Sequence, residues 1–592
     1  MHLEYNRYYR YNAMVETLED FRRLYPNLAK LYSIGRSYEG RDLWCVELTN
    51  QQTGPSEEKP GYYLDGNTHA GEVTGSMACL YTIDWLLSNY GNDVRATRIL
   101  DTKVIYVLPR ICPDGAELYL TTPHMLRSSV HEWHYPAHAD PDGLRPEDVD
   151  NNGVILQMRL RDDLAGDWKV SDDDPRLMIR RKPHDYGGEY YRVFTEGIIE
   201  NYDGISFDTA PPRWGIDMNR NYPINWKPPH TQAGAGDTPL SEPESKAVTD
   251  FLLSKKNIAG ATYHHTSGGI LLRANCVEGD DKMPPADLAM YKGLGNLGEE
   301  ITGYPCQDIY GVFADKKPQW GTFMDLTYEY LGINSFATEL WDLRGRAGVK
   351  EKGMAAFAKL SYKELEEIQL KTLHWNDEEM GGQCFYPWTA FDHPQLGEVE
   401  IGGWNIKEGQ QNPPIKFLQE ECEKALNFTL MHMEALPQLA ISSVCCEQLC
   451  SGQAGSNVYG KPAGSEQVSG NVGCDQTSGK HASRLWKITA AIENTGFLPT
   501  SSTQKAVDNK ITPPVAAKIC GAKVLQGEAD VEIGHLTGRG SSAMYGYQGA
   551  GSPAGRRKKA QWVVEAEPGT KICITAKGER AGTAACEVNL GV

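Results

Sequence analysis

The sequence lacks several features that would place it in a common class of protein. It has no apolar run of about 18 residues or more, so no membrane-spanning helix is expected. Basic residues are in the minority, with 59 against 78 acidic ones and a net charge of −19, which argues against a nucleic-acid partner. Residues 1–10 contain no apolar core of the kind found in signal peptides. The chain as written is therefore expected in the cytoplasm, or outside the cell if a leader has been removed.

The order of short β-rich runs and helical patterns predicts the fold class of the first part of the chain. Hydrophobic residues make up 40% of the 592 residues, enough for a large buried core. Apolar runs that read as strands alternate with segments of helical spacing, which is typical of an α/β sheet layered by helices. The predicted strands are 43–48, 61–65, 104–108, 258–263 and 333–340, and the predicted helices are 72–87, 322–331, 354–370 and 418–435.

An acidic, loop-like stretch at 131–215 interrupts this pattern and is predicted to be an insertion. It holds 18 acidic residues against 10 basic ones. Within it, Asp148, Asp150 and Asn152 alternate before a glycine, as in the first half of a calcium-binding loop. Arg159 stands where the closing acid of such a loop would be expected. The segment is therefore either a Ca²⁺ site or a solvated turn rich in Asp and Asn.

A change of charge and pattern near Leu436 predicts a domain boundary. Residues 1–439 carry a net charge of −23, whereas residues 440–592 carry +4. Short strand-like runs separated by turn residues follow the boundary, and this spacing favours a small all-β sandwich. The predicted domains are thus an α/β domain at 1–439, which contains the insertion, and a β-sandwich domain at 440–592.

Candidate metal ligands stand at the ends of two predicted strands. His69 and Glu72 are three residues apart where a strand gives way to a helix, and imidazole with carboxylate is a common pair of zinc ligands. Sites in open α/β sheets lie at such strand ends. His264 and His265 follow another strand, but successive side chains point to opposite faces, so only one of them can join the same metal.

Four motifs in a fixed order resemble those of the zinc metallocarboxypeptidases of the carboxypeptidase A type. They are His69-x-x-Glu72, Asp217-Met218-Asn219-Arg220-Asn221, His265-Thr266-Ser267 and Thr338-Glu339-Leu340. The resemblance covers about residues 5–435, and it is greatest to large bacterial members with such an insertion and an extra C-terminal β domain. It implies a mixed central sheet flanked by helices and one zinc ion per chain.

The resemblance also implies a role for individual residues. His69, Glu72 and His265 would be the zinc ligands, which leaves one position open for a water whose pKa the metal lowers. Glu339 would be the general base that takes the proton of this water. Arg127 would stabilise the negative charge that develops on the scissile carbonyl.

Further positions would recognise the substrate. Asn219 and Arg220 would clamp a free C-terminal carboxylate, which a planar guanidinium can bind through two hydrogen bonds. Tyr310 would be the tyrosine that closes over the substrate, although it is farther from Glu339 than is usual in the family. Met324 would form the floor of the specificity pocket, where an apolar residue favours an apolar or aromatic C-terminal side chain. Gly71 departs from the family pattern, because digestive members carry an arginine there.

The combined interpretation is a zinc-dependent carboxypeptidase that acts on peptides with a free C-terminal carboxylate. One alternative keeps the metal site but makes the chain an amidohydrolase that acts on N-acyl amino acids or cell-wall peptides. Another makes it a binding protein without catalytic activity, with the C-terminal domain docking a partner. The sequence does not identify a partner for that domain.

Overall fold

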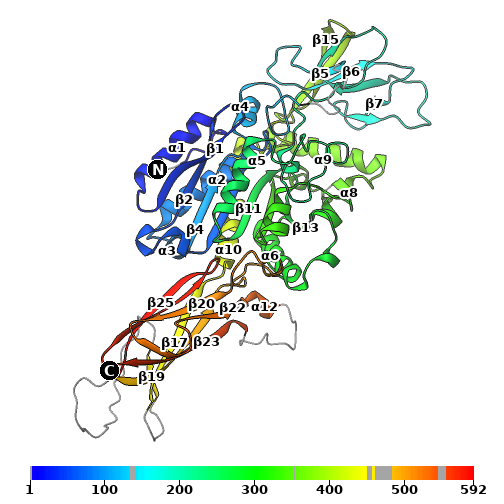
Figure 1. The fold of residues 1–592 in the computed structure, drawn as a ribbon. Helices are drawn as coiled ribbons and strands as arrows, with labels where there is room; N and C mark the ends of the chain where they lie inside the picture. Colours follow the sequence, from blue (N-terminus) through cyan, green and yellow to red (C-terminus); the bar gives the residue numbers. More distant parts are fainter. Residues whose placement is uncertain are drawn as a thin grey trace.

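The computed structural model describes residues 3–133, 142–352, 354–449, 457–460, 483–543 and 555–591. Three parts follow one another along the long axis of the molecule, with an α/β part in the middle (Figure 1). A small β sheet lies at one end, and the C-terminal β domain lies at the other. Among the described residues, no helix combines the length and the apolar character needed to cross a membrane.

An eight-stranded sheet forms the centre of the α/β part. Its strand order is β1-β2-β4-β3-β11-β14-β12-β13, with parallel pairing in the middle and antiparallel pairing of β1 with β2, β2 with β4, and β12 with β14. The predicted α/β class with a mixed central sheet is thus confirmed. The strands are β1 (Ala29–Arg36), β2 (Asp42–Leu48), β3 (Gly61–Gly66), β4 (Val104–Leu108), β11 (Ile258–Thr266), β12 (Ile270–Arg273), β13 (Cys306–Asp308) and β14 (Asn334–Leu340).

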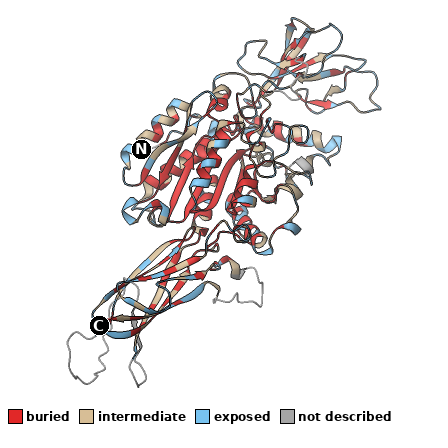
Figure 2. Ribbon diagram, in the orientation of Figure 1, coloured by how far each residue is buried: buried red, intermediate tan, exposed pale blue. Residues whose placement is uncertain are grey.

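Helices cover both faces of this sheet, and two adjacent tyrosines of β3 show it. The hydroxyl of Tyr62 lies 3.0 Å from Nδ1 of His432 in α10, whereas the ring of Tyr63 packs near Phe251 of α5. Because neighbouring side chains on a strand point to opposite faces, α10 and α5 lie on opposite sides. Figure 2 shows the buried residues gathered on the central strands. The helices are α1 (Tyr11–Leu24), α2 (Val73–Asn89), α3 (Val94–Thr102), α4 (Pro113–Thr121), α5 (Pro243–Ser254), α6 (Pro285–Thr302), α7 (Leu343–Arg346), α8 (Met354–Phe357), α9 (Tyr362–Met380) and α10 (Ile415–Ala435).

The segment predicted to be an insertion forms strands, and it shares a sheet with strands of residues 360–414, a segment that the sequence pattern did not single out and that we call the second insertion. We call the six-stranded sheet β15-β16-β6-β9-β7-β8 the insertion sheet. Its hairpin β15–β16 comes from the segment between α9 and α10 and pairs with β6 through Ile401 and Met158. The expectation of a loop-like insertion is therefore wrong for the described residues, although 134–141 lie outside them. The strands are β5 (Gly143–Pro146), β6 (Gln157–Arg161), β7 (Trp168–Val170), β8 (Met178–Arg180), β9 (Tyr191–Thr195), β10 (Gly197–Glu200), β15 (Phe385–His393) and β16 (Gly397–Trp404), with β5 and β10 paired separately.

The C-terminal part contains two antiparallel sheets with a hydrophobic core of their own. The sheet orders are β18-β17-β19-β23-β21 and β22-β20-β24-β25, which agrees with an all-β domain. Trp486 and Trp562 belong to this core, at 3% and 1% exposed. The elements are β17 (Leu439–Leu449), β18 (Asn457–Gly460), β19 (Arg484–Asn494), α11 (Gln504–Asp508), β20 (Val515–Cys520), β21 (Lys523–Gln526), β22 (Asp530–Gly534), α12 (Gly540–Ala543), β23 (Arg557–Ala566), β24 (Lys571–Gly578) and β25 (Gly582–Asn589).

Two of the predicted helices differ from the structure. Residues 322–331 form a π-helical segment, η6 (Asp325–Tyr330), instead of a longer α-helix. The predicted helix 354–370 is divided into α8 and α9, because Ser361 caps a new helix: its hydroxyl accepts from the backbone N–H of Glu364, whose side chain accepts in return from the backbone of Ser361. The apolar spacing therefore indicated helical structure in both segments, but it did not indicate the π-helical form of the first or the interruption of the second.

Candidate metal centre and substrate site

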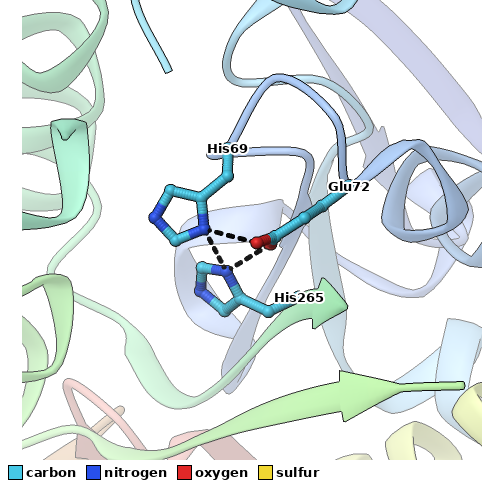
Figure 3. Close-up of side chains that lie close together, drawn as sticks. All are labelled: His69, Glu72 and His265. Atoms are coloured by element: carbon cyan, nitrogen blue, oxygen red, sulfur yellow. Dashed lines mark hydrogen bonds and ion pairs between the residues drawn. The ribbon is translucent and has the colours of Figure 1, made fainter. Parts of the chain in front are cut away.

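Three predicted ligands from two strand ends converge on one point. Nδ1 of His69 lies 2.8 Å from Oε1 of Glu72, and Nδ1 of His265 lies 2.8 Å from Oε2 of the same carboxylate. The two Nδ1 atoms are 3.1 Å apart (Figure 3). All three side chains are buried, and their ligand atoms lie within 4.8 Å of one another. Two imidazole nitrogens and a carboxylate fit the donor set that zinc prefers.

The structure decides which histidine of β11 faces this point. His264 points away, and its Nδ1 lies 2.8 Å from the hydroxyl of Thr338 on β14. Burial lowers the pKa of His264 to about 3, so this ring stays neutral in the core. His265, on the opposite face of the strand, is the one that joins His69 and Glu72.

The loop between β3 and α2 holds His69 and Glu72 in place through close backbone packing. Asn67 adopts a left-handed conformation, with φ 61°, and its side-chain amide donates to the carbonyls of His69 and Ala70. Gly75 lies so close to β11 that a Cβ atom there would stand 2.7 Å from the carbonyl oxygen of His264. The start of α2 can approach the strand only because this position is glycine.

The charge of Glu72 is stabilised by its neighbours. Burial alone would raise the pKa of this carboxyl, but His69 and His265 hold it well below its usual range. A carboxylate that stays ionised, flanked by two imidazoles, is the form that a divalent metal needs. The residues present therefore fit a zinc ion.

Asp217 lies in one of the sequence motifs, which did not indicate a role for it, and it contacts two of the predicted site residues. Its Oδ1 lies 3.1 Å from Nε2 of His69, the ring nitrogen that does not face the metal point. A carboxylate in this place orients the ring of a metal-binding histidine and favours the tautomer that binds. Its Oδ2 accepts a 3.0 Å hydrogen bond from Nε of Arg127. Asp217 thus connects a predicted ligand to the predicted oxyanion residue, and Arg127 and His69 hold its pKa well below the usual range despite burial.

Arg127 borders the metal point from the loop after α4. Its Nη1 lies 3.3 Å from Oε1 of Glu72, and its side chain is about half exposed, at 48%. Its backbone carbonyl accepts a hydrogen bond from the N–H of Ala70, which ties the arginine loop to the ligand loop. The guanidinium is therefore fixed beside the ligands while part of it still faces solvent.

Glu339 lies next to the metal point on a neighbouring strand. β11 and β14 run parallel with His265 opposite Glu339. Burial raises the pKa of Glu339 to about 8, with His265 and Arg127 opposing the rise. The carboxyl of Glu339 thus interacts electrostatically with two of the predicted ligands, His265 and Glu72, and with Arg127.

The predicted clamp and pocket floor lie beside each other. The side-chain oxygen of Asn219 accepts a 2.9 Å hydrogen bond from the backbone N–H of Phe323, the residue before Met324. Met324 is buried, at 2% exposed. Arg220 donates from Nη2 to the side-chain oxygen of Gln319, at 2.7 Å, and this partner had no signal in the sequence.

The sequence of this chain matches a known protein family. Residues 14–154 and 180–359 match the family model described as zinc carboxypeptidase, and together these stretches make up more than half of the chain. The chain belongs to the zinc carboxypeptidase family. Residues 475–589 match a second model, which is described only as a domain of unknown function.

Individual relatives cover smaller parts. Carboxypeptidase D of Mus musculus is 34% identical over 100 residues, which are 17% of this chain and 7% of the relative. Carboxypeptidase Z of Rattus norvegicus is 37% identical over 348 residues, covering 52% of this chain and 50% of the relative. The matched part thus spans less than a tenth of the length of carboxypeptidase D and half of that of carboxypeptidase Z.

Similar solved structures include thrombin activatable fibrinolysis inhibitor, which is 16% identical, with a TM-score of 0.41 and coverage of 72% of this chain and 74% of that chain. Carboxypeptidase A from Helicoverpa armigera is 15% identical, with a TM-score of 0.38 and coverage of 64% and 74%.

Tyr310, the tyrosine predicted to close over the substrate, is the next of the predicted site residues. It belongs to the π-helical segment η5 (Ile309–Phe313), and its ring lies beside Gly279 in the loop after β12. Within the described part of the chain, its side chain has no hydrogen bond or ring contact with the ligands, Glu339 or Arg220. Its role as the tyrosine that closes over the substrate stays a prediction.

The second insertion supports the ligand loop, in a way that no sequence motif indicated. The side-chain amide of Asn412 donates to the carbonyl of Gly71 at 2.7 Å, and its oxygen accepts from the backbone and the hydroxyl of Thr74. A Cβ atom at Gly71 would stand 2.6 Å from the side chain of Gln411. Gln411 thus occupies the space into which a longer side chain at Gly71 would extend.

The predicted calcium residues lie together with an acid that the sequence did not single out. Asp148 and Asp150 cluster with Glu196, and the side-chain amide of Asn152 donates to Oδ2 of Asp150 at 3.0 Å. The carboxylates already accept hydrogen bonds: Asp148 and Asp150 from the backbone of Asn152, and Glu196 from Val149 and Leu156. These bonds are those of a turn closed on itself, and a Ca²⁺ ion at Asp148, Asp150 and Asn152 stays a prediction.

Proposed function

We propose that the chain is a zinc-dependent carboxypeptidase that removes single residues from the C-terminus of peptides. The observation that carries this proposal is the convergence of His69, Glu72 and His265, with Glu339 on the adjacent strand opposite His265. Three protein ligands leave a fourth position open, which is the arrangement of catalytic zinc sites. When bound, zinc would supply a Lewis acid that activates water and polarises the scissile carbonyl.

The remaining chemistry comes from side chains of the chain itself. Glu339 accepts the proton of the attacking water and passes it to the nitrogen of the leaving amino acid. Arg127, held by Asp217 next to Glu72, offers N–H donors to the carbonyl oxygen as negative charge develops on it. The arginine is preorganised, because its neighbours hold it before substrate arrives.

Recognition of a chain end is assigned to Arg220 and Asn219. Arg220 has a neutral partner, Gln319, and the carbonyl of Asn219 as its hydrogen-bond acceptors, so its positive charge is not neutralised by these contacts. A guanidinium in this state can bind the free carboxylate of a peptide in a bidentate manner. Peptides with a free C-terminus are therefore the proposed substrates.

The surroundings of Met324 favour an apolar or aromatic C-terminal residue. Met324 and Phe323 are buried, and the ring of Phe323 packs edge-on against Tyr263 at 4.8 Å. The one acid next to them, Asp325, already accepts hydrogen bonds from Thr322, and burial raises its pKa to about 7. It is therefore poorly suited to pairing with a basic side chain.

The test uses the full-length protein and a blocked peptide with a C-terminal phenylalanine. We expect release of free phenylalanine, loss of this activity on treatment with a chelator, and recovery when Zn²⁺ is restored. The same peptide with an amidated C-terminus should be cleaved far more slowly, which separates a carboxypeptidase from an amidohydrolase. Full activity in chelated, metal-free protein, or equal cleavage of the amidated peptide, would contradict the proposal.

A further inference from the structure

A cavity of about 600 Å³ opens beside the catalytic centre, and the proposed mechanism does not use it. We call it the side cavity. It lies between the turn that joins β11 to β12, the segment after β14, helix α9 and the end of β16. A volume of this size exceeds that of one amino-acid side chain and is in the range of sites that bind whole small molecules.

The wall of the side cavity includes residues that follow His265 and Glu339 closely in the chain. Ser267 and Gly268, in its wall, come two and three residues after the ligand His265. On the other strand, Trp341 comes two residues after Glu339, and the N–H of Gly268 donates to its carbonyl at 2.8 Å. A Cβ atom at Gly268 would lie 3.7 Å from Cβ of Glu339. The side cavity thus borders the strand ends that carry His265 and Glu339, where residues next to the scissile bond of a bound peptide would lie.

Most of the wall is apolar, and much of it comes from outside the stretch that matches the family. Leu365, Ile368 and Thr372 of α9 and Trp404 of β16 line the cavity, and all follow residue 359, where the family match ends. Phe357, just before that point, faces the same space. Part of the wall of the side cavity therefore lies outside the stretch that matches the family.

Four charged residues stand in the wall, two acidic (Asp342 and Glu351) and two basic (Arg344 and Lys352), so their formal charges cancel. Lys352 is paired with Asp342, so each neutralises the other. The guanidinium of Arg344 lies 4.4 Å from the centre of the Phe357 ring. This cation–π contact stabilises the positive charge of the arginine. Apolar side chains are therefore the ligands that this wall favours.

We propose that the side cavity binds large apolar residues that precede the scissile bond of a peptide substrate. This inference rests on the proposed carboxypeptidase function, whose C-terminal clamp fixes the direction of the chain. The second insertion then gives the enzyme selectivity for the residues that precede the scissile bond, in addition to its selectivity for the residue that is released.

The test compares two peptides with the zinc-loaded, full-length protein. Both are N-acetylated and end in the same two residues, glycine and phenylalanine; they differ only in the two preceding residues, which are leucine in one and glycine in the other. We expect kcat/KM to be about tenfold or more higher for the leucine peptide, because two leucine side chains leave water. Equal values for the two peptides would overturn the inference.

A variant that fills the cavity gives the inference a second test. Gln369 lines the cavity from α9, and Gln369→Trp should bring the ratio of the two kcat/KM values towards one. Lys371→Trp is the matched control, because Lys371 is exposed and lies about 200° around the same helix. The control should keep the preference of the wild type. A loss that is equal for both peptides in Gln369→Trp would count against the side cavity as a binding site.

Failure of the proposed function can be told apart from failure of this inference. If the zinc-loaded protein cleaves neither peptide, the carboxypeptidase proposal is contradicted, and binding of the two intact peptides is then measured by calorimetry. Tighter binding of the leucine peptide, lost in Gln369→Trp and kept in Lys371→Trp, would still support the side cavity. Equal binding of both peptides would overturn it.

Discussion

His265 and Glu339 lie directly opposite each other on the parallel strands β11 and β14. One strand thus supplies a metal ligand and the next supplies the carboxyl that works beside it. Parallel pairing makes this possible, because both strands end at the same edge of the sheet. The relationship separates two roles that a mutation can distinguish, namely holding the metal and moving a proton.

Glu339→Gln should remove activity without removing zinc. Glutamine keeps the shape of the side chain but cannot accept the proton, so we expect kcat to fall by about 10²- to 10⁴-fold. Zinc content, measured by elemental analysis, should stay at one ion per chain. The exposed Glu367→Gln on α9 is the control and should behave as wild type. Loss of zinc in Glu339→Gln would instead make Glu339 a ligand.

Asp217→Asn should weaken zinc binding although Asp217 does not face the metal. The carboxylate orients His69 through Nε2 and also holds Arg127. Loss of its charge should lower zinc affinity by about 10- to 100-fold, which competition with a chelator of known affinity would measure. Asp281→Asn, an exposed position on the loop before α6, serves as the control. Unchanged affinity in Asp217→Asn would show that the contact with His69 has no influence on the metal.

Arg220→Ala should abolish the discrimination between free and amidated peptides. A charged hydrogen-bonded pair is worth about 1.5–3 kcal/mol, so kcat/KM for the free peptide should fall by about 10- to 100-fold. The already slow cleavage of the amidated peptide should change little. Arg161→Ala, on the exposed side of the insertion sheet, should leave both rates unchanged. If the variant retains its preference for a free carboxylate, another residue must be the clamp.

Asn412→Ala should destabilise the zinc site from the second insertion. The substitution removes the hydrogen bonds to Gly71 and Thr74 and leaves these buried groups unpaired, at a cost of about 1–3 kcal/mol each. We expect a lower thermal unfolding temperature and weaker zinc binding. The zinc-dependent gain in unfolding temperature should shrink as well. An equal loss of stability with and without zinc would limit Asn412 to a purely structural role.

Glu244 should make the protein less stable as the pH rises. Burial raises the pKa of this carboxyl to about 7, and within the described residues its Oε2 has no hydrogen-bond partner. The folded state therefore holds the proton more tightly than the unfolded state, for which the ordinary value of 4.5 applies. The stabilisation is present below pH 4.5 and is lost as the pH rises to about 7, on the order of 3 kcal/mol in all.

Glu244→Gln should remove this pH dependence, since the amide does not ionise. Unfolding temperatures at pH 5 and pH 8 would show it as a smaller difference than in the wild type. Glu16→Gln, an exposed position on α1, should leave the difference unchanged. The same pH dependence in Glu244→Gln as in the wild type would assign it to other groups.

The sequence by itself determined much of the fold and the local parts of the site. Continuous apolar runs such as that of β4 predict buried strands, because a strand covered on both faces has no polar side to alternate. The spacing of His69 and Glu72 predicts a shared ligand point, because the two residues belong to one short loop. A pattern of this kind depends only on neighbours in the chain.

Only the tertiary structure decided which distant residues complete the site. Asp217 reaches His69 across 148 residues of sequence, and Asn412 reaches Gly71 across 341. The hairpin β15–β16 joins strands of the first insertion in one sheet. Such contacts arise when packing brings separate segments together. The sequence around a single asparagine or a hairpin does not indicate which distant residues it will contact. The side cavity has the same origin, since helix α9 and the strand ends meet only in the folded chain.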